Sequence, residues 1–194
     1  MKHVSMTLIA ATIVLTCGLS YGQEEPGPNF EHLKSYGPML GTWRYEGPLL
    51  EDLPGIAEKG PKILFQFSWR RILNKNVVEE NVLVELDGKT IIAGKALIGW
   101  NAEKKEIAYG GMNSLGNLHL GTVAFDKATK TSTLTTKGID KDGEEISFKA
   151  VVTKTGRDTL TWQALQRAGG IVEGPSPVYA FKRVKRVKRT KSSK

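Results

Sequence analysis

Hydrophobic and polar residues alternate along most of the chain. The clearest run is 61–71, where Ile63, Phe65, Phe67 and Trp69 occupy every second position. Successive side chains of a strand point to opposite faces, so this pattern predicts a strand with one buried face. The pattern recurs, and it predicts ten strands at 40–46, 61–71, 77–86, 89–100, 105–112, 118–125, 131–137, 144–153, 158–165 and 177–184.

The connections between these strands are short and carry turn residues. Asp87-Gly88 is the strongest hairpin signal, because this dipeptide suits a two-residue turn. Short strands joined in sequence by tight turns are typical of an up-and-down barrel, whose closure removes exposed sheet edges. We therefore expect an all-β fold, a single antiparallel up-and-down barrel of about ten strands over residues 39–184. The exception is the Gly- and Pro-containing loop 47–60, which we expect to act as a lid.

Residues 23–38 precede the barrel and predict a linker and a short helix. The linker, 24–28, is polar and holds two prolines. Asn29 is a suitable N-cap, and Phe30 and Leu33 fall on one face of the helix that would follow. Gly37-Pro38 is expected to end that helix.

The first 22 residues have the pattern of a signal peptide. Lys2 precedes an uncharged stretch, 6–19, that is too short to span a bilayer as a helix, and small residues come before Gln23. Cleavage after Gly22 would make the protein periplasmic or secreted, with no transmembrane span afterwards. The alternative is a lipoprotein anchored at Cys17, which is disfavoured because Thr16 precedes the cysteine.

Cys17 is the one cysteine of the chain and lies in this leader. The mature protein therefore lacks a disulfide framework, a cysteine-based zinc site and a cysteine nucleophile. Its histidines are His32 and His119, and no phosphate-binding loop or serine-hydrolase motif is present. We expect no catalytic residues, no metal, no cofactor and no enzymatic activity.

The positive charge is concentrated at the C-terminus. Eight of the last thirteen residues are basic, and without them and Lys2 the chain has 28 − 9 = 19 basic against 20 acidic residues, about −1. Like charges repel, so we expect residues 185–194 to be a disordered tail. Docking to an anionic envelope polymer or lipid would use Lys182, Arg183, Lys185, Arg186, Lys188 and Arg189. The alternative is a tail that only increases solubility.

Several short motifs resemble a known family. In order along residues 40–183, they are Leu40-Gly41-Thr42-Trp43, Phe67-Ser68-Trp69 with Asn74-Lys75-Asn76, Ile98-Gly99-Trp100-Asn101, Ser114-Leu115-Gly116, Gly138 with Asp142-Gly143, and Asp158-Thr159-Leu160-Thr161-Trp162-Gln163. This series resembles the lipocalin-like, or calycin-type, barrel module of unknown function in exported bacterial proteins. That module often lies beside a SnoaL-like domain, which is missing from this chain. The resemblance implies a barrel closed at its base by Trp43 against a basic residue of the last strand, here Arg183.

Aromatic residues predict what the barrel encloses. We expect a ligand-binding set of Phe67, Trp69, Arg71, Trp100, Tyr109 and Trp162. The alternative is that the tryptophans only fill the core. An inward arginine in an apolar barrel would point to a binding site, because a buried charge needs a partner.

Other polar residues are interpreted as structural. His119 is expected on the outer surface, between inward Leu118 and Leu120, and a haem would need it to face inward. The pair Glu79-Glu80 points to opposite faces of its strand, and both are expected as outward charges beside turns. Gly94 lies within a strand, where it relieves crowding or allows a bulge.

Two functions follow from these patterns. The first is a barrel that binds a small hydrophobic or amphipathic ligand in its interior. The second is a non-enzymatic adaptor or structural module that docks to an anionic surface through the basic tail. Neither involves specific recognition of nucleic acid.

Overall fold

The computed structural model describes residues 25–185. One short helix and ten strands make up this part of the chain. Their bounds are η1 Glu31–Met39, β1 Gly41–Pro48, β2 Lys62–Ile72, β3 Val77–Leu86, β4 Lys89–Asn101, β5 Glu106–Asn113, β6 Leu118–Asp126, β7 Thr131–Ile139, β8 Glu145–Lys154, β9 Thr159–Ala168 and β10 Tyr179–Arg183. The predicted strands agree with these bounds to within a few residues.

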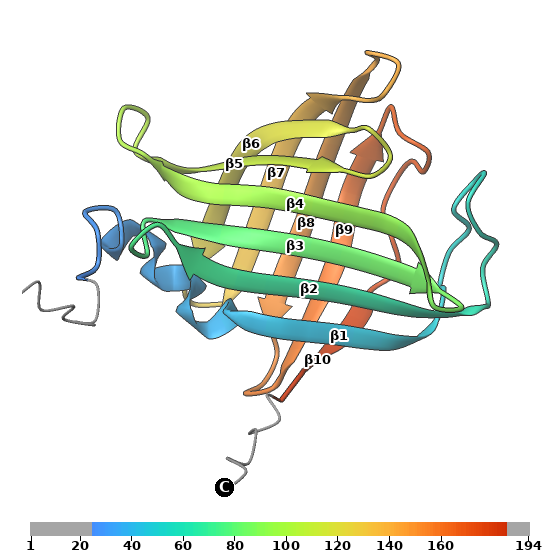
Figure 1. Ribbon diagram of the computed structural model, residues 1–194, viewed down its shortest axis with the longest axis horizontal. Helices are drawn as coiled ribbons and strands as arrows, with labels where there is room; N and C mark the ends of the chain where they lie inside the picture. The colour runs from blue at the N-terminus through green and yellow to red at the C-terminus, as the bar shows by residue number, and fades with distance from the viewer. Residues whose placement is uncertain (1–24, 186–194) are drawn as a thin grey trace, which may run out of the picture.

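The ten strands form one closed antiparallel barrel (Figure 1). Each strand pairs with the next along the chain, and β1 pairs with β10 to close the sheet. That closing seam is short, with Trp43 opposite Arg183 and Arg44 opposite Lys182. The predicted all-β, up-and-down barrel with a short N-terminal helix is confirmed.

Turn chemistry explains one tight connection. Asp87 and Gly88 both have positive φ, 51° and 74°, which is the backbone of a two-residue hairpin turn. Aspartate and glycine tolerate this left-handed region better than other residues. The hairpin predicted between β3 and β4 is therefore present for the expected reason.

The helix η1 is a 3₁₀ helix that covers one end of the barrel. Leu33, Tyr36 and Met39 are its buried residues. Asn29 does not cap it; instead the Asn29 amide donates to Asn76 Oδ1 at 2.9 Å. The predicted end at Gly37-Pro38 is wrong, because the helix continues to Met39 with Pro38 inside it.

The two ends of the barrel differ. The turns after β2, β4, β6 and β8 lie at the η1 end, which we call the base. The connections after β1, β3, β5, β7 and β9 lie at the opposite end, which we call the mouth (Figure 1). The longest of these are 49–61 and 169–178. Within residues 25–185, no helix combines the length and the apolar character needed to cross a bilayer.

The interior is filled unevenly. Near the closing seam it holds large aromatic side chains, with Phe65 and Phe67 packed against Phe181 at ring-centre distances of 5.1 and 5.3 Å. On β4 and β5 the inward positions include Gly94 and Gly111. Small residues on one wall leave space that the aromatic side does not fill.

Candidate ligand-binding cavity

That space is a cavity of about 310 Å³ inside the barrel. It reaches from Tyr36 and Met39 of η1 at the base to Leu53 and Val172 in the mouth loops. Most of its lining is aliphatic or aromatic. A mainly apolar cavity with a few polar groups is the usual form of a small-molecule site.

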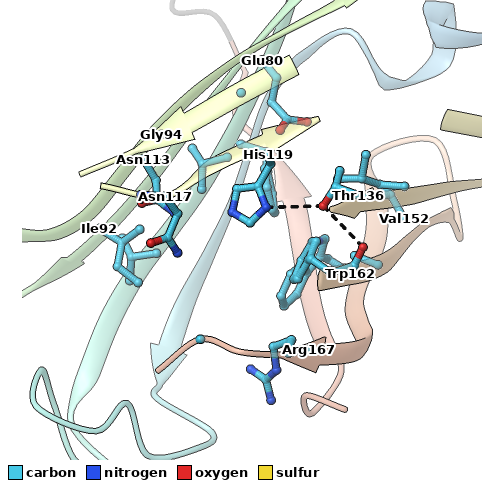
Figure 2. Close-up of a pocket in the computed structure, with 18 of the residues that line it drawn as sticks. Glu80, Ile92, Gly94, Asn113, Asn117, His119, Thr136, Val152, Trp162 and Arg167 are labelled. Atoms are coloured by element: carbon cyan, nitrogen blue, oxygen red, sulfur yellow. Dashed lines mark hydrogen bonds between the residues drawn. The ribbon is translucent and has the colours of Figure 1, made fainter. Parts of the chain in front are cut away.

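Four of the six predicted ligand-binding residues line this cavity, namely Phe67, Trp69, Tyr109 and Trp162. Their rings belong to strands β2, β5 and β9, so the closed sheet brings them together. Phe67 and Trp69 are stacked, with ring centres 5.2 Å apart. Figure 2 shows Trp162 beside His119 and Thr136.

The other two predicted residues, Arg71 and Trp100, are not part of the cavity lining. Trp100 stacks on His32 with ring centres 3.8 Å apart. The guanidinium of Arg71 lies 4.3 Å from the Phe30 ring centre and donates to the Leu33 carbonyl at 3.2 Å. Both side chains therefore hold the N-terminal segment against the base.

Trp43 and Arg183 meet at the base, as the family resemblance implies. The Arg183 guanidinium carbon lies 4.0 Å from the centre of the Trp43 ring, and Trp43 Nε1 donates to the Met39 carbonyl at 2.7 Å. Arg183 also donates to the carbonyls of Leu40 and Pro38, at 2.6 and 3.0 Å. These contacts join the first strand, the last strand and η1.

Glu80 is a functional candidate that the sequence interpretation missed. It stands opposite Trp69 in the β2–β3 register, so it faces inward rather than outward, and it is the fourth residue of β3 rather than a residue beside a turn. Its Oε2 accepts from Trp69 Nε1 at 2.6 Å, and its Oε1 accepts from the Tyr109 hydroxyl at 3.3 Å. Burial raises the pKa of Glu80, and these two hydrogen bonds only partly oppose the shift.

Two tyrosines beside Glu80 share its environment. Burial, followed by the Glu80 charge, raises the pKa of Tyr36 and of Tyr109. Ser132, beside the Tyr36 hydroxyl, opposes the shift of Tyr36. Both phenols therefore stay neutral and act as hydrogen-bonding groups.

Glu79 is in the opposite environment, on the outer face of the same strand. It forms ion pairs with Arg70 and, at 3.1 Å, with Lys95, and both of these cations are largely exposed. Hydrogen bonds from Arg70 and then Lys95 lower the pKa of Glu79 to about 2. The two cations cover the carboxylate, so only 7% of the Glu79 side chain is exposed.

His119 faces inward and lines the cavity (Figure 2), so the surface position expected for it is wrong. Leu118 and Leu120 are the outward residues, with 37% and 60% of their surface exposed. His119 Nδ1 lies 3.4 Å from Thr136 Oγ1, which also reaches the Phe148 carbonyl at 3.5 Å. Burial lowers the pKa of His119, which favours the neutral ring.

An ion pair connects the two long loops at the mouth. Arg167 binds Glu51 through two hydrogen bonds, at 3.0 and 2.7 Å, and donates to the Gly174 carbonyl at 2.9 Å. Glu51 belongs to the loop after β1 and Gly174 to the loop after β9. Arg167 therefore ties together both long loops over the cavity, at the end that was predicted to form a lid.

The residues expected to bind an anionic surface divide into two groups. Lys182 and Lys185 are exposed, whereas Arg183 is engaged at the base. Arg186, Lys188 and Arg189 lie outside the described residues.

Among residues 25–185, no group of three or more His, Cys, Asp or Glu side chains is arranged to hold a metal.

Comparison with known proteins supports the fold. No family model matches the chain, and no curated protein sequence matches it significantly. The crystal structure of Rv2717c from M. tuberculosis is similar, with a TM-score of 0.56 and 15% identity over 83% of this chain and 100% of that chain. A redesigned β-barrel aligns with a TM-score of 0.39 and 9% identity, over 78% of this chain and 96% of that one. The likeness to Rv2717c shows the barrel fold alone.

Proposed function

We propose that this protein binds a small hydrophobic or amphipathic ligand inside its barrel, as an exported, non-enzymatic member of the lipocalin-like barrels. The observation that carries the proposal is the cavity of about 310 Å³, which lies inside the barrel between η1 and the mouth loops. Burial of apolar ligand surface there would contribute roughly 25 cal/mol per Å².

The arrangement of polar groups supports an amphipathic ligand. Val82, Val84 and Ile92 supply aliphatic surface to the lining. Glu80 supplies polar atoms at one point of the cavity, and the neighbouring pair His119 and Thr136 supplies them at another (Figure 2). A ligand with an apolar body and one polar group can satisfy both kinds of contact.

A fluorescence titration tests the proposal. N-phenyl-1-naphthylamine, a neutral apolar dye, should bind saturably to the purified protein with one site per chain. Gly94→Leu should weaken binding by about tenfold or more, because a side chain there extends into the cavity, next to Val82 and Asn113.

Ala93→Leu is the matched control, since residue 93 points to the outer face of the same strand. It should bind the dye as the wild type does. Equal binding by the wild type and a folded Gly94→Leu variant would contradict binding in the interior.

A second candidate function is docking to an anionic surface. The concentration of basic residues in 182–194, on a body of about −1, favours it. Each basic residue near such a surface contributes about 1 kcal/mol. Deleting 186–194 leaves Arg183 in place and should abolish retention on vesicles rich in anionic lipid at low salt. Unchanged retention of the truncated protein would refute this function.

A further inference from the structure

We infer that the cavity selects hydrophobic organic cations, with the ligand's ammonium group held by Glu80 and its apolar body directed toward the mouth. This inference rests on the proposed function, because it names the chemical class that the same cavity would take. It is carried by the position of Glu80, by the charges around it and by the aromatic rings beside it.

The carboxylate of Glu80 faces the deep part of the cavity. Glu80 is the fourth residue of β3, which begins at the base, and it lies on the inward face with Val78 and Val82. Its side chain keeps some accessible surface although it is inside the barrel, so this surface faces the cavity. A ligand that enters from the mouth therefore meets Glu80 at the far end of its path.

No basic side chain among residues 25–185 forms an ion pair with Glu80. Arg70 and Lys95, which lie close by in sequence or register, are on the outer face with Glu79. Arg71 faces inward but turns toward Phe30 and Leu33. The hydrogen-bond donors to Glu80 are the neutral side chains of Trp69 and Tyr109.

A buried carboxylate without a cation is costly, because neutral donors replace only part of its lost hydration. The raised pKa of Glu80 reflects this cost. A ligand ammonium would supply the missing opposite charge and donate a hydrogen bond in a site of low polarity. A ligand carboxylate would instead place two like charges together.

Aromatic rings around Glu80 favour the same ligand. Tyr36, Trp69 and Tyr109 line the cavity beside the carboxylate, and Phe67 stacks on Trp69. The face of an aromatic ring attracts a cation, and this attraction is strengthened when water is excluded. A carboxylate surrounded by aromatic rings therefore suits an ammonium group better than a neutral or anionic one.

The experiment compares three ligands with the same tail and different charge. Octylamine, octan-1-ol and octanoate are titrated into the full-length mature protein near neutral pH by isothermal calorimetry or by displacement of the apolar dye. We expect octylamine to bind about tenfold or more tightly than octanol, and octanoate to bind most weakly. Glu80→Gln should remove the preference, so that octylamine and octanol bind this variant within about threefold of each other.

Glu79→Gln is the matched control, because it removes a carboxylate one residue away on the outer face. It should keep the octylamine preference of the wild type. Equal binding of octylamine and octanol, or a preference that survives in Glu80→Gln, would overturn the inference while the proposed function stands. Failure of the wild type to bind octanol, octylamine and the dye would instead overturn the proposed function.

Discussion

Glu79 and Glu80 are neighbours in sequence, but strand geometry gives them opposite surroundings. Glu79 lies between two exposed cations on the outer face, and Glu80 lies inside the barrel beside Trp69 and Tyr109. The pKa of Glu79 is lowered and that of Glu80 is raised. The two carboxylates should therefore affect stability with opposite dependence on pH.

We predict that Glu80→Gln stabilises the protein in alkaline solution. A carboxyl whose folded pKa is raised holds its proton more tightly in the folded state, so the wild type loses stability as pH rises above the unfolded pKa of about 4.3. Glutamine cannot ionise and avoids this loss. Thermal unfolding should show a higher Tm for the variant at about pH 8, with a difference that shrinks toward about pH 4. A difference independent of pH would contradict the assignment.

Glu79→Gln should behave in the opposite way. A carboxylate with a lowered pKa stabilises the folded state above its unfolded pKa, and that contribution is lost as pH falls through the folded value of about 2. The variant should be less stable than the wild type near neutral pH. Denaturant unfolding at several pH values should show the gap closing between about pH 5 and pH 2; a gap that widens in acid would refute the ion pairs.

The inward position of Glu80 could have been predicted from the residues around it. Within 77–86 the even positions Val78, Val82 and Val84 are apolar, so Glu80 falls on the core face. The charge of the residue led to the opposite interpretation. A charged residue that breaks an apolar face is thus informative, since its burial needs a compensating interaction.

At the scale of elements, the positions of the strands along the chain could be predicted better than which face of each strand points into the barrel. In 118–126 both faces carry large apolar residues, Leu118 and Leu120 on one and Val123 and Phe125 on the other. The outward leucines stay exposed in the barrel, so alternation alone pointed His119 the wrong way. The base contacts of Arg71 and Trp100 depend on where η1 packs, which strand periodicity does not encode.

The mouth loops give a prediction at this scale. Glu51 and Arg167 are both mostly buried, with 16% and 13% of their side chains exposed, and they form a two-bond ion pair. A double-mutant cycle of Glu51→Gln and Arg167→Gln should give a coupling free energy of about 1.5–3 kcal/mol by denaturant unfolding.

The exposed pair Arg44–Glu46 serves as the comparison, with side chains 38% and 49% exposed. Its coupling should stay below about 1 kcal/mol, because water screens the charges. Similar coupling for both pairs would show that Arg167 does not hold the mouth loops as described.

For the whole molecule, closure depends on a short seam between β1 and β10. Two register pairs join these strands, and Arg183 adds bonds to Leu40 and Pro38 and a contact with Trp43. The sequence pattern could predict ten strands and a closed sheet. The cavity could not be predicted in the same way. It depends on which strands place aromatic side chains and which place small residues on opposite walls of the closed barrel.

We predict that Arg183→Met lowers the free energy of unfolding by about 2–3 kcal/mol, since it removes charge-assisted hydrogen bonds and a cation–π contact. Lys182→Met, at the exposed neighbouring position, should change it by less than about 0.5 kcal/mol. Denaturant unfolding measures both values, and hydrogen exchange should show faster opening of β1 and β10 in Arg183→Met alone. Equal effects of the two substitutions would contradict the role of Arg183 in closure.

The interior location of the bound ligand is tested most directly by the indole N–H signals of the four tryptophans in a ¹⁵N-labelled protein, assigned by single Trp→Phe variants. Trp69 and Trp162 line the cavity, whereas Trp43 and Trp100 lie at the base outside its lining. Titration with N-phenyl-1-naphthylamine should shift the Trp69 and Trp162 signals and leave the Trp43 and Trp100 signals in place. Shifts confined to Trp43 and Trp100, or to amides of the exposed residues Leu118 and Leu120, would place the ligand outside the barrel and contradict the account.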